Sequence, residues 1–171
     1  GNDLATFPDF PAEIRAPQGT VPGVSGFQVH IGNTEINTPG DIADVLIAMN
    51  PAALKSNKKS IKEGGTIIVN IDSFEKRDIE KAGYENSPLE DSSFEGFNII
   101  ESRITSLTRE SLKDSGLDGK SINRCKNMFA LGIVYWLFNR PMKQTENFLK
   151  KKFKSKPDIV KANIKVLHDG Y

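Results

Sequence analysis

The sequence is poor in the residues that hold metals and disulfides. Its 171 residues include one cysteine, Cys125, and two histidines, His30 and His168. A single cysteine forms no internal disulfide and supplies too few thiolates for a zinc site or an iron–sulfur cluster. We therefore expect no metal centre in this chain alone, and we expect the reducing cytoplasm as its compartment.

An excess of charge of one sign and a long apolar run are lacking as well. The formal net charge is +1, whereas nucleic-acid-binding proteins usually carry a basic excess, so no nucleic-acid partner is expected. The longest apolar stretch, residues 128–138, is shorter than the roughly 20 residues that a membrane-spanning helix needs. The start, Gly1 to Asp3, has neither basic residues nor an apolar run, so no signal peptide is predicted.

The pattern of apolar residues predicts an α/β fold. Strands are expected over residues 27–31, 44–49, 66–70 and 97–104, and helices over 52–57, 75–81 and 121–138, from 145 and from 157. Continuous apolar strands with helices between them are typical of a sheet that is covered on both faces. The sequence thus predicts a three-layer α/β/α domain with a mixed, mostly parallel sheet, occupying residues 1–171.

Several polar residues and glycines predict where these elements begin and end. Asn50, directly before Pro51, is expected to cap the first helix, and Asp72 with Ser73 the second. The pair Gly64-Gly65 is expected to form a turn. Gly83 is expected to end the second helix.

One short motif suggests nucleotide binding. Gly119-Lys120-Ser121 matches the end of a phosphate-binding loop, but the full pattern needs a glycine where Asp114 stands, and no strand precedes it. A helix start capped by Ser121 is the favoured interpretation. A stand-alone nucleotide binder is kept as the third hypothesis for function.

Other candidate residues compose no catalytic site. Glu13 and Arg15 lie between prolines, two residues apart in an extended segment, and so point the same way. They are suited to bind a phosphate or carboxylate, or to form an ion pair across an interface. Cys125 is expected to be a packed structural thiol, and no carboxylate neighbour in sequence suggests acid–base work by either histidine.

The sequence also resembles a known family, the 2-oxoacid:ferredoxin oxidoreductases, in their gamma region. The similarity is closest to the form fused ahead of the alpha region in 2-oxoglutarate enzymes. The matching segments are FPDFPAEIRAP at residues 7–17, GTVPGV at 19–24, TPGD at 38–41, AMNPAAL at 48–54, KNMFALG at 126–132 and the final Gly170-Tyr171. A first strand and a glycine-rich turn that begin the gamma region in this family are missing before Gly1.

The resemblance implies a region of an assembly that decarboxylates a 2-oxoacid on thiamine diphosphate with magnesium, passes electrons through iron–sulfur clusters to ferredoxin, and makes the acyl-CoA. It implies 2-oxoglutarate as substrate, with pyruvate or a branched-chain 2-oxoacid as alternatives. The expected partners are the thiamine-binding alpha and beta regions, ferredoxin and coenzyme A. The isolated chain is expected to be inactive, with none of the thiamine or cluster ligands in it.

Two roles within such an assembly follow from the resemblance. In the first, the chain helps to form the coenzyme A side of the site, with Glu13, Arg15 and Asn50 as candidates for coenzyme A or interface contact. In the second, the chain is a structural interaction module that orders the complex and touches no ligand. The proline-stiffened segment from Pro11 to Pro22 would then be its docking surface.

Overall fold

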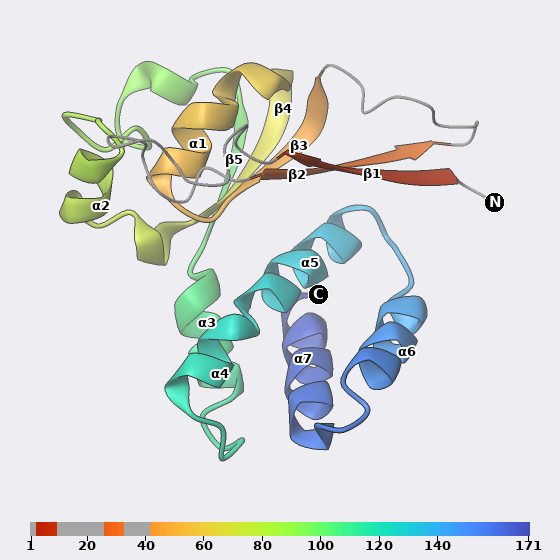
Figure 1. Cartoon of the computed structure of the whole chain (residues 1–171). Helices are drawn as coiled ribbons and strands as arrows, with labels where there is room; N and C mark the ends of the chain where they lie inside the picture. Colours follow the sequence, from red (N-terminus) through yellow and green to blue (C-terminus); the bar gives the residue numbers. More distant parts are fainter. Residues whose placement is uncertain (1–2, 10–25, 33–41) are drawn as a thin grey trace. The chain divides into compact units, whose positions relative to one another are not determined.

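The computed structural model describes residues 3–9, 26–32 and 42–171. The chain folds as two compact units, Gly1–Ser102 and Arg103–Tyr171. The first unit holds all of the described strands, and the second is helical (Figure 1). The predicted α/β class is confirmed, and a parallel sheet with helices is consistent with the predicted three-layer arrangement.

The described residues of the first unit form two sheets. β1 (Asp3–Asp9) and β2 (Gly26–Gly32) form an antiparallel pair, in which Pro8 lies opposite Phe27. The strand β2 was predicted, but β1 was not, because its proline, Pro8, argues against regular structure. A two-stranded sheet has only edge strands, and an edge strand tolerates a proline.

The second sheet contains three parallel strands in the order β3-β4-β5. Its elements, with the helices that connect them, are β3 (Ala43–Ala48), α1 (Pro51–Asn57), β4 (Ile61–Asn70), α2 (Lys76–Lys81) and β5 (Asn98–Ser102). Short 3₁₀ turns lie at Lys58–Ser60, Ile71–Ser73 and Ser92–Phe94. The predicted strands over 44–49 and 66–70 are confirmed, and the one over 97–104 is two residues shorter at its end.

The predicted turn at Gly64-Gly65 is wrong, because both glycines lie inside β4. The pairing between β3 and β4 shifts there, from Ala43 opposite Ile61 to Val45 opposite Thr66. Gly64 has a φ of 72°, a conformation that side chains other than glycine rarely adopt. The glycine pair therefore produces an irregularity within the strand and not its end.

The core of the first unit forms around the three parallel strands. α1 packs against β3, and buried apolar side chains from the strands, α1 and the Ser92–Phe94 turn come together. The fully or almost fully buried members are Ala48, Leu54, Ile61, Ile67, Val69 and Phe94. Burying such side chains contributes about 1.5–3 kcal/mol for each large one, before conformational entropy is counted.

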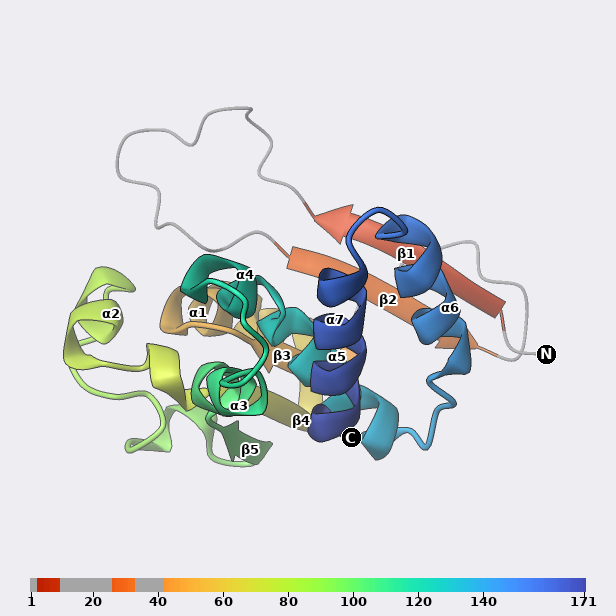
Figure 2. The same cartoon turned by 90° about the horizontal axis from the view of Figure 1, so that it is seen from below.

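The second unit contains five helices among the described residues. They are α3 (Ile104–Ser111), α4 (Gly119–Arg124), α5 (Lys126–Leu137), α6 (Lys143–Lys152) and α7 (Pro157–Gly170). α5 and α7 pack closely, as Figures 1 and 2 show. Gly132 permits this approach: a Cβ there would overlap the carbonyl oxygen of Leu167 and lie 2.8 Å from the carbonyl carbon of Gly170.

The helix predicted over 121–138 is divided in the structure. α4 ends at Arg124 and α5 starts at Lys126, with Cys125 between them. The predicted cap at Ser121 is also wrong, because Asp118 accepts the backbone hydrogen bonds of Lys120 and Ser121 at 2.9 and 3.0 Å. α3 was not predicted, although its inward residues Ile104 and Thr108 are four residues apart, as one helix face requires.

Within the part of the chain that the structure describes, no helix is long and apolar enough to cross a membrane.

Candidate functional site at the carboxyl edge of the sheet

Polar side chains gather where the three parallel strands end. The register pairs Ala48 with Val69 and Asn70 with Ser102. Asn50, two residues beyond the end of β3, therefore lies at the same edge as Asn70 and Ser102. The carboxyl edge of a parallel sheet is where α/β proteins usually bind ligands, so this edge is the candidate site of the first unit.

Asn50 is positioned by the start of α1. Its backbone is extended, and its side-chain oxygen accepts a hydrogen bond of 2.8 Å from the backbone N–H of Ala53. Pro51 occupies the first helical position, where its fixed φ suits the helix and its missing N–H costs nothing. The predicted capping role of Asn50 is confirmed, and the residue is half-buried.

Asn70 is the most enclosed polar group of this edge. It is fully buried, and its amide nitrogen donates to the hydroxyl of Ser73 at 3.1 Å. Burial of an amide without such partners would cost free energy. The hydroxyl of Ser73 therefore accepts the hydrogen bond of Asn70 and does not cap α2. The N-cap residue of α2 is Glu75, whose side chain makes no capping hydrogen bond to this helix. The predicted cap by Asp72 and Ser73 is wrong, whereas Gly83 does end α2 with a φ of 75°.

Asn50, Asn70, Ser73 and Ser102 offer carboxamides and hydroxyls, which hydrogen-bond a polar ligand but do not transfer protons near neutral pH. In residues 26–32 and 42–171, no group of three His, Cys, Asp or Glu side chains is arranged to hold a metal ion. The sequence-predicted candidates Glu13 and Arg15 lie outside the described residues, so of the three candidates only Asn50 is placed at this edge.

The phosphate-loop interpretation of Gly119-Lys120-Ser121 finds no support in the geometry. The backbone N–H groups that would bind phosphate there already donate to the Asp118 carboxylate. Hydrogen bonds from Ser121 lower the pKa of Asp118, so this carboxylate stays charged and repels an anion. The motif is the start of a short helix.

Cys125 is enclosed between α4 and α5. It is 2% exposed, and its thiol donates to the carbonyl oxygen of Ser121 at 3.4 Å. Burial raises its pKa, which disfavours the reactive thiolate. The prediction of a packed structural thiol is confirmed.

An ion pair that the sequence did not suggest joins α6 and α7 of the second unit. His168 Nε2 of α7 lies 2.8 Å from Glu146 Oε1 of α6. The hydrogen bond with His168 lowers the pKa of Glu146, with smaller contributions from the charges of His168, Lys143 and Lys150. His168 and Glu146 are 22 positions apart along the chain, and only the packing of α6 against α7 joins them, so neighbours in the sequence gave no sign of this pair.

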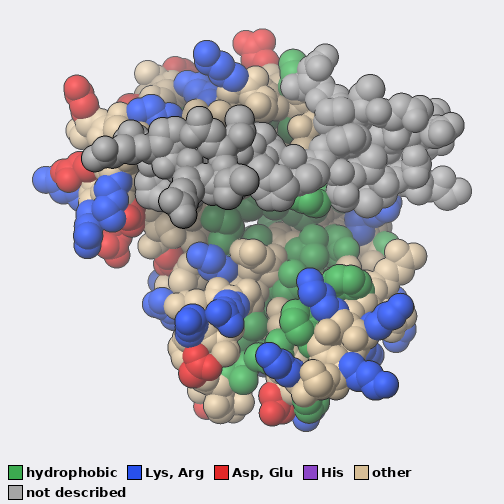
Figure 3. Space-filling model, viewed as in Figure 1, with side chains coloured by type: hydrophobic (Ala, Val, Ile, Leu, Met, Phe, Trp, Pro, Cys, Tyr) green, Lys and Arg blue, Asp and Glu red, His purple; other side chains and the backbone are tan. Residues whose placement is uncertain are grey.

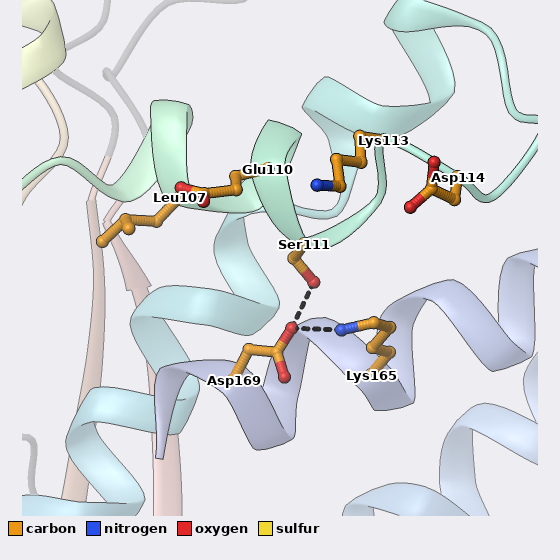
Figure 4. A pocket seen from close by; sticks show the side chains of 7 residues that line it. All are labelled: Leu107, Glu110, Ser111, Lys113, Asp114, Lys165 and Asp169. Carbon is orange, nitrogen blue, oxygen red and sulfur yellow. Dashed lines mark hydrogen bonds and ion pairs between the residues drawn. The ribbon is translucent and has the colours of Figure 1, made fainter.

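A shallow hollow of about 440 Å³ also lies in the second unit. It is lined by Leu107, Glu110, Ser111, Lys113, Asp114, Lys165 and Asp169 (Figure 4). The Asp169 carboxylate accepts hydrogen bonds from the Ser111 hydroxyl and, at 2.6 Å, from Lys165 Nζ. Because these bonds occupy Asp169, we interpret the hollow as a packing contact between α3 and α7.

Comparisons with known proteins cover the whole chain. A family model described as pyruvate ferredoxin/flavodoxin oxidoreductase matches residues 1–171. The chain is 47% identical over all 171 residues to the 2-oxoglutarate oxidoreductase subunit KorA of Mycobacterium tuberculosis. The match covers 26% of that subunit, so the chain spans about a quarter of its relative's length.

Two solved structures share the fold. The 2-oxoglutarate:ferredoxin oxidoreductase from Magnetococcus marinus, with 2-oxoglutarate, coenzyme A and succinyl-CoA bound, aligns with a TM-score of 0.67 and 26% identity over 99% of this chain and 25% of its own. The gamma subunit of a keto/oxoacid ferredoxin oxidoreductase from Geobacter sulfurreducens aligns with a TM-score of 0.56 and 16% identity, over 99% of this chain and 80% of its own. The latter similarity shows the fold alone.

Proposed function

The chain belongs to the pyruvate ferredoxin/flavodoxin oxidoreductase family, and from this premise we propose that it is the gamma-type region of an enzyme that oxidatively decarboxylates 2-oxoglutarate, forms the acyl-CoA and reduces ferredoxin. The observation that carries the proposal is the 47% identity to a 2-oxoglutarate oxidoreductase subunit along the entire chain. Pyruvate and branched-chain 2-oxoacids are the competing substrates. The chain contributes no catalytic residue, and alone it is inactive.

The cofactors of such an assembly belong to its other regions. An iron–sulfur cluster does not fit this chain, because it needs several thiolates and the one cysteine is buried between two helices. No carboxylate cluster suited to magnesium occurs in the described residues. Thiamine diphosphate with its magnesium ion, and the clusters, are therefore assigned to the thiamine-binding alpha and beta regions. We place the assembly in the cytoplasm, which suits a chain with one free thiol.

The role that we propose for the chain is to assemble the complex and to form the coenzyme A side of its site. Glu13, Arg15 and Asn50 are the candidate residues. Arginine is suited to the phosphates of coenzyme A, because its guanidinium donates several hydrogen bonds in a fixed geometry. Support for Asn50 comes from its place at the carboxyl edge of the sheet, next to the start of α1. The solved relative from Magnetococcus marinus contains coenzyme A.

A structural interaction module is the second candidate function, and one observation favours it. In β2, Phe27 is 64% exposed and Val29 46%, whereas the polar residues Gln28 and His30 are half-buried. Ile42, shortly before β3, is 59% exposed. Exposed apolar groups of this size are often covered by another protein chain.

The two roles are distinguished with Arg15→Ala in the complete enzyme complex. If Arg15 binds coenzyme A, the variant assembles normally and its KM for coenzyme A rises by about tenfold or more, as for loss of a charged hydrogen bond. If the chain only orders the complex, the yield of assembled complex falls. The complex that still assembles then has an unchanged KM for coenzyme A. Arg77→Ala, at an exposed position of α2, is the matched control and should change neither quantity.

A further inference from the structure

The two units of the chain carry opposite charge, although the whole chain is nearly neutral. Residues 103–171 contain fifteen Lys and Arg and six Asp and Glu, a formal charge of +9. Residues 1–102 contain eight Lys and Arg and sixteen Asp and Glu, a formal charge of −8. The net charge of +1 therefore conceals a strongly basic helical unit. Figure 3 shows Lys and Arg side chains spread over these helices.

The basic charge is concentrated around α6. Seven lysines and only two acidic residues, Glu146 and Asp158, lie in residues 143–161, which we call the lysine segment. All seven lysines are exposed: Lys143, Lys150, Lys151, Lys152, Lys154, Lys156 and Lys161. Crowding like charges lowers the stability of a fold, so the concentration is not explained by folding.

Little of this charge is neutralised within the chain. Among the described residues, Lys143 alone of the seven has a carboxylate within 4.0 Å, Glu146, and that carboxylate is closer to His168. Lys152 Nζ instead lies 5.3 Å from the ring centre of Phe148, which is 57% exposed, and 5.7 Å from that of Phe153. An exposed aromatic ring among cations gives the surface an apolar contact point as well as charge.

The composition of the lysine segment favours a protein partner with a carboxylate-rich surface. The segment contains lysine and no arginine, and lysine ammonium groups are strongly hydrated point charges without the forked geometry that grips phosphate. Such charges accelerate encounter and set orientation while allowing quick release. These properties suit a carrier protein that binds once per electron and leaves.

We propose that the lysine segment is the docking surface for the acidic electron-carrier protein, of the ferredoxin class, that the complete enzyme reduces. The proposal rests on the proposed function, because it needs an enzyme that delivers electrons to such a carrier. It adds to that function a role for this chain in acceptor binding, beside the proposed roles in coenzyme A binding and in assembly.

The test uses the complete complex carrying Lys150→Glu, Lys151→Glu and Lys152→Glu together. Initial rates with 2-oxoglutarate and coenzyme A are measured with two acceptors, a purified acidic ferredoxin and methyl viologen, a small cationic dye that needs no docking surface. The expected result is a KM for ferredoxin raised about tenfold or more at low ionic strength, with an unchanged rate of dye reduction. The difference in the KM for ferredoxin between the variant and the wild type should shrink as added salt screens the charges.

The matched control reverses three exposed charges of the acidic unit, with Lys59→Glu, Lys76→Glu and Arg77→Glu, and should leave the KM for ferredoxin unchanged. If the lysine variant assembles poorly, the triple change of the same lysines to Gln is measured in its place, with a smaller increase expected. A wild-type KM for ferredoxin in either lysine variant overturns the docking proposal. Failure of the wild-type complex to reduce the dye with any 2-oxoacid would instead overturn the proposed function.

Discussion

The side-chain oxygen of Asn50, two residues beyond β3, accepts a 2.8 Å hydrogen bond from the backbone N–H of Ala53 and so closes the first turn of α1. This bond holds the polar group of Asn50 at the carboxyl edge of the sheet. The capping of α1 and the proposed contact with coenzyme A therefore involve the same side chain. Only a substitution that keeps one of these two functions can separate them.

Substitutions at Asn50 are expected to separate these roles. Asn50→Ala removes the cap and should lower the free energy of unfolding by about 1 kcal/mol, whereas Asn50→Ser keeps a capping oxygen and most of the stability. If the carboxamide also contacts coenzyme A, Asn50→Ser raises the KM for coenzyme A in the complete complex without a shift in melting temperature. An unchanged KM in Asn50→Ser would limit Asn50 to its capping role.

The close crossing of α5 and α7 predicts a strong effect at Gly132. In Gly132→Ala the new Cβ would overlap the backbone of Leu167 and Gly170, and backbone atoms cannot move aside as a flexible side chain does. We expect a loss of about 1–3 kcal/mol in unfolding free energy, measured by urea denaturation. Gly119→Ala is the control, since no atom lies within 4 Å of its Cβ. A Gly132→Ala protein as stable as the control would contradict this packing.

The buried thiol of Cys125 should react slowly and should be dispensable for turnover. Because burial raises its pKa, little thiolate is present at neutral pH. Maleimide labelling should therefore follow the unfolding transition in urea. Cys125→Ala should leave the turnover number of the complex unchanged, apart from a modest loss of stability through the lost contacts. Rapid labelling of the native protein, or loss of turnover on substitution, would show a reactive cysteine instead.

The pairing of Glu146 with His168 predicts an acid-sensitive contribution to stability. The folded state lowers the pKa of Glu146, mainly through the hydrogen bond with His168, so the contribution is present above the ordinary glutamate pKa of about 4.3 and is lost as pH falls through the lower folded value. The melting temperature of the wild type should exceed that of Glu146→Gln near pH 6, and the gap should close toward about pH 3. A gap that stays constant over this range would argue against the ion pair.

The strands and helix starts were predictable where the signal is local. The apolar runs within residues 44–49 and 66–70 predicted β3 and β4, and Asn50 before Pro51 predicted the cap of α1. The turn predicted at Gly64-Gly65 was wrong because a glycine with positive φ occurs in strand irregularities as well as in turns. α3 was missed, although Ile104 and Thr108 carry its periodicity.

The side-chain contacts that sequence reasoning missed join residues that are distant in the sequence. Glu146 meets His168, and Ser111 meets Asp169, only because helices pack together. The charge contrast between the two units was readable from the sequence, but the net charge of +1 concealed it until the structure gave the boundary at Ser102. Candidates Glu13 and Arg15 remain predictions.

The central claim is that this chain is part of a 2-oxoglutarate:ferredoxin oxidoreductase, and a substrate panel tests it most directly. The native complex is captured through this chain and supplied with coenzyme A, a low-potential dye, and 2-oxoglutarate, pyruvate or a branched-chain 2-oxoacid in separate assays. We expect partner chains in the captured material and dye reduction that depends on coenzyme A and is fastest with 2-oxoglutarate. Reduction with pyruvate alone would contradict the substrate, and a captured complex that reduces the dye with none of the 2-oxoacids would contradict the function.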